Sequence, residues 1–477
     1  MMLVLVIAIG LPTALGYLAV SLLLGDDRET GMLERLCMAW PLGMGLVTIQ
    51  MFLLGLLRVP LTLGPIAALP ALEAAGLFWW ARRRRVPLAP GIASGLWRDC
   101  TDRGVPWARR AVITLLVLWA AVKLASVFLE TSLRPIWAWD TWANWSVGAK
   151  LFYHAKSLLL DAPAGDFFGV GAVSRFGSYP LHNPLMQVWI SLWIGSFDEV
   201  LVKLTSPLTL SCLSVSLYLF MARETGRLAA LGLLVIFLGS PLLSYHGTEL
   251  YSDLPLSAAL AFSLAAFVHA LRGRERYWPV AGLFAAIAIW TKDESLFFVL
   301  PLLLSAAVHI RGEGAGRPGR AVRFASLLVP FAVIVPWYAF KFSHTFGLGA
   351  DVVSQKFVFH PEIVGNVLAN LLSLDSFNVL ILFLPLLLLA AGRPDRPFLH
   401  AAFPVVCYLL FFTFVYAFTA FYYQHFSTGT VFFRNLLTAY PSLCLLDALL
   451  VKRVRERSAV PAAAPSRTSG KGTKKKR

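Results

Sequence analysis

The residues best suited to chemistry in this sequence are ionisable side chains that directly adjoin long apolar runs. Asp140 stands first among them, within Trp-Asp-Thr-Trp just beyond such a run. A carboxylate beside apolar aromatic surface has its charged form disfavoured, so Asp140 could serve as a general base. An aspartate in this place is equally suited to cap the N-terminus of a helix. The local sequence leaves both interpretations open.

A second group lies in the run His-Gly-Thr-Glu-Leu-Tyr-Ser-Asp-Leu-Pro, which holds His246, Glu249 and Asp253. If this run is helical, its spacing of three and four places the three side chains on one face. A histidine with two carboxylates could hold a divalent cation. Asp253 just before Leu-Pro is equally a helix start signal. No cofactor is certain from this pattern, and a divalent cation is the one it allows.

Two basic residues, Lys292 and Arg434, also lie at the ends of apolar runs. Lys292 occurs in Thr-Lys-Asp-Glu, so its anionic partner is Asp293, Glu294 or a lipid phosphate. Arg434 occurs in Val-Phe-Phe-Arg-Asn, and guanidinium groups pair bidentately with phosphate. Simple extension of the Arg434 side chain to the membrane surface is the alternative.

Tyr179 and His182 belong to the run Tyr-Pro-Leu-His-Asn-Pro, where a long connection returns to an apolar run. Turn formation explains both prolines. His182 and Tyr179 are candidate substrate-binding residues, although His182 is also compatible with an ordinary place in a loop.

The composition indicates that lipid is the main solvent of this chain. Of its 477 residues, 58% are hydrophobic and 14% are charged, with a mean hydropathy of +0.69. Soluble domains average about 25% charged residues because their surfaces face water. We therefore expect an all-α integral membrane protein, a polytopic bundle of about 13 transmembrane helices, since each crossing needs roughly 20 mostly apolar residues.

The candidate spans follow one another along the chain with short connections. They are Met2–Leu24, Leu36–Leu57, Leu61–Ala81, Ala111–Leu129, Val200–Ala222, Leu228–Leu243, Leu254–Leu271, Pro279–Trp290, Leu296–Ile310, Phe324–Phe342, Val367–Ala391, Leu399–Phe421 and Leu436–Val451.

The placement of basic residues predicts the orientation of these spans, because loops rich in Lys and Arg stay in the cytoplasm. Most of the 42 lysines and arginines fall in segments that the thirteen-span map puts on one side. These segments are 25–35, 82–110, 223–227, 272–276, 311–323, 393–396 and 452–477. The C-terminus is then cytoplasmic, and the groups described above face outside, across a plasma or inner membrane.

This map divides the chain into three parts. Residues 1–110 form a three-helix membrane module with a basic cytoplasmic loop, residues 111–451 a transmembrane core, and residues 452–477 a disordered basic tail. The core contains a long outer loop, residues 131–199. Within that loop, the spacing of Trp142, Trp145, Ala149 and Phe152 predicts an amphipathic helix along the membrane interface.

The net charge of +16 is explained by topology and by anionic lipid headgroups. Its basic residues lie in short loops with no recognition module, so no nucleic-acid partner is expected. The five cysteines lie in predicted spans or in the basic loop and form no C-x-x-C pair. Neither a disulfide framework nor a zinc site is predicted.

Taken in order, these pieces resemble the GT-C superfamily of glycosyltransferases that use polyprenyl-phosphate sugars. They are similar to glycosyltransferase family 39, the branch with dolichyl-phosphate-mannose protein mannosyltransferases and the bacterial aminoarabinose transferase of lipid A. The resemblance covers roughly residues 111–450. The segments that carry it are Trp139–Asp140, Tyr179–Pro184, Arg223–Arg227, Tyr251–Pro255, Ala281–Lys292 and Arg434–Pro441.

The resemblance implies a membrane glycosyltransferase with a polyprenyl-phosphate sugar donor and a glycan, lipid or protein acceptor. It implies that Lys292 and Arg434 hold the donor phosphate and that Asp140 takes a proton from the acceptor hydroxyl. Glu249 and Asp253 would bind a cation or substrate, or position Lys292. The chain departs from the family in its three extra N-terminal spans and in having a single acidic residue where an Asp-Glu pair is typical.

Two other classes of protein remain as alternatives. A transporter or flippase of a lipid-linked sugar would typically show internal repeats and broken helices near the midplane. We find no repeat, and the ionisable residues gather at the outer face. A membrane scaffold has no need for such a group of ionisable residues.

Overall fold

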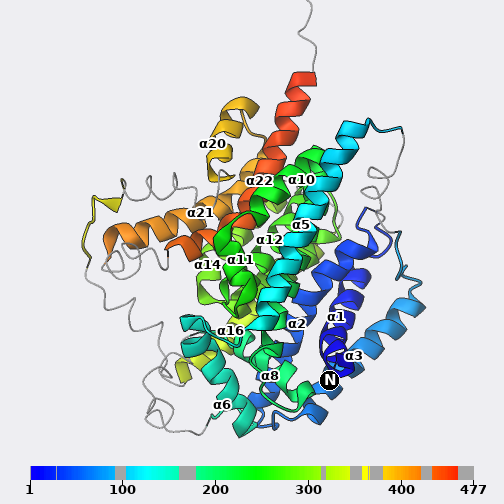
Figure 1. Ribbon diagram of the computed structural model, residues 1–477, viewed down its shortest axis with the longest axis vertical. Helices are drawn as coiled ribbons and strands as arrows, with labels where there is room; N and C mark the ends of the chain where they lie inside the picture. Colours follow the sequence, from blue (N-terminus) through cyan, green and yellow to red (C-terminus); the bar gives the residue numbers. More distant parts are fainter. Residues whose placement is uncertain are drawn as a thin grey trace, which may run out of the picture.

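The apolar runs of the sequence form helices in the computed structural model of the protein (Figure 1). The structure describes residues 2–27, 29–91, 104–160, 179–312, 319–343, 357–363, 365, 380–419 and 432–459. Within these ranges, an isolated bridge between Phe357 and Thr419 is the only strand-like pairing. The prediction of an all-α protein is confirmed for this part of the chain.

Ten helices in the described ranges are long and apolar enough to cross a membrane. They are α1 (Met2–Leu24), α2 (Met32–Leu56), α3 (Leu63–Arg83), α5 (Trp107–Leu133), η3 with α9 (Leu201–Leu204, Thr205–Thr225), α12 (Asp253–Leu271), η4 with α14 (Asp293–Ser295, Leu296–Gly312), α15 with α16 (Arg320–Leu328, Phe331–Ser343), α21 (Arg396–Phe418) and α22 (Phe432–Ala459). Helices satisfy their backbone groups internally, as lipid requires. The chain is a multi-pass helical membrane protein.

A sharp bend interrupts the span that the sequence predicted at Leu228–Leu243. α10 (Arg227–Leu238) and α11 (Pro241–Thr248) could together form an eleventh span, but the two helices are bent by 70° at the break. Pro241 explains the break, because proline lacks a backbone N–H and favours the first turn of a new helix. Ser240 caps that helix by accepting a hydrogen bond from the N–H of Leu243.

The expected total of thirteen spans is therefore not reached in the described residues. α13 (Tyr277–Thr291) has 15 residues, too few for the usual crossing of roughly 20. Of the run expected at 367–391, α20 (Leu380–Ala391) is described, and the rest lies outside the described residues.

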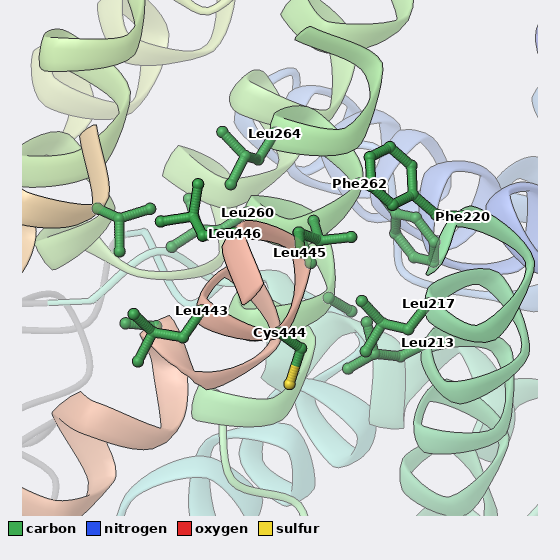
Figure 2. Close-up of a cluster of buried hydrophobic side chains, with 14 of the residues drawn as sticks. Leu213, Leu217, Phe220, Leu260, Phe262, Leu264, Leu443, Cys444, Leu445 and Leu446 are labelled. Atoms are coloured by element: carbon green, nitrogen blue, oxygen red, sulfur yellow. The ribbon is translucent and has the colours of Figure 1, made fainter. Parts of the chain in front are cut away.

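Four helices, α2, α9, α12 and α22, lie at the centre of the bundle. The apolar stretch of α12 is 94% buried and that of α22 is 89% buried, whereas that of α5 is 17% buried. The central helices are thus enclosed by protein, whereas α5 lies at the periphery of the bundle. Figure 2 shows the result, with Leu217 of α9, Phe262 of α12 and Leu445 of α22 in one buried cluster.

The N-terminal helices pack into this centre through side-chain hydrogen bonds. Trp40 of α2 donates to the hydroxyl of Thr209 in α9 at 3.0 Å. Trp189 of α8 (His182–Ile194) donates to the carbonyl oxygen of Ala8 in α1 at 2.7 Å. The expected N-terminal module, residues 1–110, therefore shares a packed and hydrogen-bonded interface with the rest of the bundle.

Gly16 of α1 and Gly43 of α2 allow the two helices to approach closely, as small residues do in membrane helix pairs. Gly43→Ala is expected to destabilise the protein by about 1–3 kcal/mol, since the added methyl group would overlap the carbonyl oxygen of Pro12. The measurement is the thermal unfolding midpoint in detergent. Gly10→Ala is the matched control, because nothing lies within 4 Å of its added methyl group. Equal midpoints for the two variants would contradict the close-packed crossing.

Most of the basic segments meet at one end of the bundle. Ion pairs join them there, namely Asp26–Arg276, Glu29–Arg274, Glu34–Arg223, Glu224–Arg272, Glu224–Lys452, Glu275–Arg323 and Asp395–Arg453. α6 (Val147–Ala155) and α8 lie at the opposite end from the C-terminal end of α22 (Figure 1). α12 has 19 residues, so it separates Asp253 at its start from Arg272 by about 28 Å, close to the thickness of the hydrocarbon layer.

The amphipathic helix that the pattern predicts from Asp140 to Leu160 is present, and it ends earlier, at Ala155. A π-helical turn, η1 (Thr141–Ser146), continues directly into α6. Trp145, Ala149 and Phe152 are buried on one face, while Trp142 is half exposed. The sequence did not predict α8 in the same loop, and residues 161–178 lie outside the described residues.

Candidate active site

Asp253 is the buried centre of the site. It begins α12, and its side chain is 1% exposed. Oδ1 accepts a hydrogen bond from Lys292 Nζ at 3.2 Å, and Oδ2 accepts from Arg434 Nη2 at 2.9 Å and Nε at 3.2 Å. A buried carboxylate needs such partners, because an unpaired charge out of water is costly. Asp253 thus binds both cations that the sequence singled out.

Arg434 lies in the first turn of α22 and joins two carboxylates. Besides Asp253, its guanidinium pairs through Nη1 with Asp140. Its charge also lies 4.7 Å from the centre of the Tyr251 ring, in a cation–π contact. Extension toward the membrane surface, the alternative for this residue, is not what the structure shows.

Asp140 faces the site rather than capping a helix. It precedes η1, but its side chain makes no capping hydrogen bond. Instead Oδ1 accepts from the side-chain amide of Asn144 at 3.2 Å, and Oδ2 pairs with Arg434. The helix-cap interpretation of Asp140 is therefore wrong. Its side chain is 23% exposed, against 1% for Asp253, so Asp140 is the more accessible of the two carboxylates.

Lys292 lies in the extended link between α13 and η4. It pairs with Asp253 and with Glu294, both at 3.2 Å, whereas Asp293 pairs with Lys341 at 2.6 Å. Burial alone would lower the pKa of Lys292, but the Asp253 and Glu294 carboxylates outweigh it and raise the pKa. The amine is therefore a permanent cation in this site.

The site holds more negative than positive charge. Arg434 and Lys292 face Asp140, Asp253 and Glu294, so two cations share three carboxylates. Asp140 and Glu294 are each about a quarter exposed, at 23% and 24%. Asp140 and Glu294 are thus the outer, more accessible carboxylates of the site, whereas Asp253 is enclosed between Lys292 and Arg434.

His246 is buried beside this group. Its Nδ1 lies 3.9 Å from Asp253 Oδ2, and its ring packs on Tyr251 with centroids 4.5 Å apart. Within the described residues, neither ring nitrogen forms a hydrogen bond. The helical face expected for residues 246, 249 and 253 does not form, because α11 ends at Thr248 and Glu249 is extended, with φ −131° and ψ 160°.

Glu249 forms an ion pair with a different cation, Lys203. Its Oε1 accepts from Lys203 Nζ at 2.8 Å, and the two side chains are 0% and 1% exposed. Among the described residues, no group of three or more His, Cys, Asp or Glu side chains is placed to hold a metal ion. The residues allowed for a divalent cation by the sequence do not fit one in this arrangement.

Tyr179 and His182 have separate surroundings. The Tyr179 ring lies 6.0 Å from Lys292 Nζ, at the edge of the site. His182 begins α8 and is buried; its Nδ1 hydrogen-bonds to the Thr48 hydroxyl of α2 at 2.8 Å. Burial lowers the pKa of His182 to about 4, so the ring is neutral near pH 7. It links the N-terminal helices to the core rather than lining an accessible surface.

Lys203 and Thr48 are the residues of this region that the sequence analysis missed. A signal for Lys203 existed, because it is a lysine within the predicted span Val200–Ala222, where a charge is costly. Thr48 carries no comparable signal. It accepts from Trp290 at 3.0 Å as well as contacting His182, which only the packed structure reveals.

Comparison with known proteins finds a matching family model for part of this chain. Residues 180–340 match the family model described as dolichyl-phosphate-mannose-protein mannosyltransferase, which confirms the resemblance to that family over this part of the chain. The matched segment contains Asp253 and Lys292 but ends before Arg434. A comparison with curated proteins finds no match.

The fold is similar to that of ArnT from Cupriavidus metallidurans. Two crystal structures of that protein match, one bound to undecaprenyl phosphate and one in the apo state. Each has a TM-score of 0.50 and 16% sequence identity, over 71% of this chain and 60% of the ArnT chain. The chain thus spans about 60% of the length of the solved protein, and the likeness is one of fold.

Proposed function

We propose that this protein is a glycosyltransferase that moves a sugar from a polyprenyl-phosphate donor to an acceptor hydroxyl. The observation that carries the proposal is the Arg434–Lys292 pair, two cations anchored on the buried Asp253 whose outer partners, Asp140 and Glu294, are partly exposed. The family match and the ArnT fold support the same donor class. The acceptor is a glycan, a lipid or a protein.

The proposed reaction is a single displacement, as the resemblance to the family implies. The donor phosphate replaces Asp140 on Arg434 and Glu294 on Lys292, so Asp140 is released as the donor binds. The acceptor oxygen then attacks the anomeric carbon, its proton passes to Asp140, and the bond to the phosphate oxygen breaks. Lys292 and Arg434 stabilise the departing polyprenyl phosphate. One displacement inverts the anomeric configuration, and positioning with charge stabilisation supplies most of the acceleration.

The proposed site faces outside a plasma or inner membrane, and the C-terminus is cytoplasmic. This orientation rests on the basic segments gathered at the end of the bundle away from Asp253, because such segments remain in the cytoplasm. The surrounding partner is the lipid bilayer, which presents the donor phosphate at its outer surface.

A transfer assay tests the function. Purified protein in detergent is offered radiolabelled polyprenyl-phosphate sugars, with polysaccharide, lipid A and protein as acceptors. Label should move to one acceptor class, and in sealed right-side-out vesicles it should reach an acceptor that cannot cross the membrane. Movement of the donor between leaflets without transfer of label would instead identify a flippase.

A further inference from the structure

Asp293 follows Lys292 in the chain, but its side chain binds α16, and the proposed reaction does not use it. Its Oδ2 accepts a hydrogen bond from Lys341 Nζ at 2.6 Å. Its Oδ1 accepts from Trp337 Nε1 and from the Tyr338 hydroxyl, each at 3.2 Å. These three donors belong to α16, so one carboxylate joins the link after α13 to that helix.

Lys292 is an extended residue between two helical segments. α13 ends one residue before it and η4 begins one residue after it, and its own backbone has φ −162° and ψ 136°. Its N–H donates to the carbonyl oxygen of Ala288, and its carbonyl oxygen accepts from the N–H of Ser295, both at 3.1 Å. The Lys292 amine reaches Asp253 from this short link. Its place in the site therefore depends on how the backbone of the link is held.

The part of α16 that binds Asp293 is itself tightly packed. Trp337 is 0% exposed, and its ring packs on Phe52 of α2 and Trp290 of α13, with centroids 6.1 Å and 5.9 Å away. Trp290 lies two residues before Lys292, and Asp293 lies one residue after it. The link is thus attached to α16 on both sides of the residue that carries the cation.

Stability alone is a weak reason for the Asp293–Lys341 ion pair. The Lys341 side chain is 2% exposed, and apolar side chains of similar volume often stabilise a fold as well as a buried ion pair does. Hydrogen bonds differ from apolar contacts in being directional. Three donors on one carboxylate therefore fix where Asp293 lies, and with it the backbone of the residue before it.

We infer that Asp293, held by α16, is a positioning residue that keeps the Lys292 amine 3.2 Å from Asp253 and in reach of the donor phosphate. The inference rests on the proposed function, in which Lys292 binds that phosphate. Asp293 acts here through its neighbour in the chain and not through contact with a substrate. A misplacement of about 1 Å can cost on the order of 10²-fold in rate, so the effect of such a displacement is measurable.

The experiment replaces the ion pair in two ways. The Leu/Met variant, Asp293→Leu with Lys341→Met, removes both charges and the acceptor for the donors of α16. The Asn/Gln variant, Asp293→Asn with Lys341→Gln, removes both charges but keeps a carbonyl oxygen for the Trp337 and Tyr338 donors. We expect the Leu/Met variant to bind labelled polyprenyl phosphate roughly 5–10-fold more weakly, and the Asn/Gln variant to recover most of that loss.

Combination with Lys292→Ala separates positioning from a general structural defect. If Asp293 acts through Lys292, adding the Leu/Met changes to Lys292→Ala should alter the donor affinity by less than about 2-fold, because the group that they displace is absent. Independent losses would multiply instead. A full further loss on the Lys292→Ala background, or an Asn/Gln variant that binds as weakly as Leu/Met, would overturn the inference.

A second ion pair of the same helices provides the control. Arg323 of α15 pairs with Glu275, just before α13, at the basic end of the bundle. Glu275→Leu with Arg323→Met should leave the donor affinity at the wild-type value. Thermal unfolding midpoints check that each variant folds. If the Leu/Met variant does not fold, Asp293→Asn with Lys341→Met takes its place in the same comparisons, because it keeps the acceptor for the two ring donors of α16.

Failure of the inference and failure of the proposed function give different results. If Lys292→Ala binds polyprenyl phosphate as tightly as the wild-type protein, the proposed phosphate site fails and the inference fails with it. If Lys292→Ala binds weakly while the Leu/Met variant binds normally, the proposed site stands. Asp293 is then a structural partner of α16 alone, and the inference is wrong.

Discussion

Asp140→Asn is expected to lower turnover by roughly 10²–10⁴-fold, the usual contribution of a positioned general base. Asparagine keeps the size of the side chain and can still accept the hydrogen bond from Asn144, but it cannot take a proton from an acceptor hydroxyl. Binding of a polyprenyl-phosphate sugar should not weaken, because Arg434 and Lys292 are intact and the Asp140 charge no longer competes for Arg434. Single-turnover transfer and direct donor binding measure the two effects separately.

A matched control is Asp198→Asn. Asp198 lies in the loop after α8, and its carboxylate accepts hydrogen bonds from the nearby N–H groups of Val200 and Leu201. Its replacement should leave turnover unchanged. Near-normal transfer by a well-folded Asp140→Asn protein would remove Asp140 from the mechanism.

Lys292→Ala and Arg434→Ala are each expected to weaken donor binding by at least ~10-fold, since loss of a buried charged contact typically costs several kcal/mol. Each variant leaves Asp253 with one remaining cation, so neither strands this buried carboxylate. Both proteins should therefore fold, which thermal unfolding in detergent checks. The affinity is measured with a labelled polyprenyl phosphate.

Lys150→Ala serves as the control for these two variants. Lys150 lies in α6 at the same end of the bundle and pairs with Glu199, away from Asp253. Its loss should leave donor affinity unchanged. If Lys292→Ala and Arg434→Ala also bind the donor like the wild-type protein, both cations are structural ion-pair partners of Asp253 and nothing more.

The members of the central site could be predicted from the sequence, because ionisable residues beside apolar runs are costly and therefore rare. Asp140, Asp253, Lys292 and Arg434 were each found this way, and the structure joins them in one network. Which of these side chains pair with one another could not be predicted, since the four residues lie at the ends of different helices. For Lys292 the local sequence left Asp293, Glu294 and a lipid phosphate open as partners, and the family resemblance allowed Asp253 to position it; the structure shows Glu294 and Asp253.

The helical spacing argument failed at His246, Glu249 and Asp253 for a physical reason. Proline is well tolerated in the first turn of a helix, and α12 starts at Asp253, two residues before Pro255. The break turns Glu249 toward Lys203 and separates it from the other two side chains. Hydropathy reports apolar length and not direction, so the sequence predicted one straight span at Leu228–Leu243. The break at Pro241 instead divides this run into two helices bent by 70°.

The interlocking of α1 and α2 with later helices has a consequence for how the protein is made. Arg223, the ion-pair partner of Glu34, follows it by 189 positions in the chain. Trp290, which donates a hydrogen bond to Thr48, follows that residue by 242 positions. At roughly 5–20 residues per second of synthesis, the Glu34 carboxylate stays without this partner for about 10–40 s. During that time the first hairpin is in the membrane with its polar contacts unmade. The early helices therefore acquire these contacts only after the ribosome has delivered residues 223 and 290.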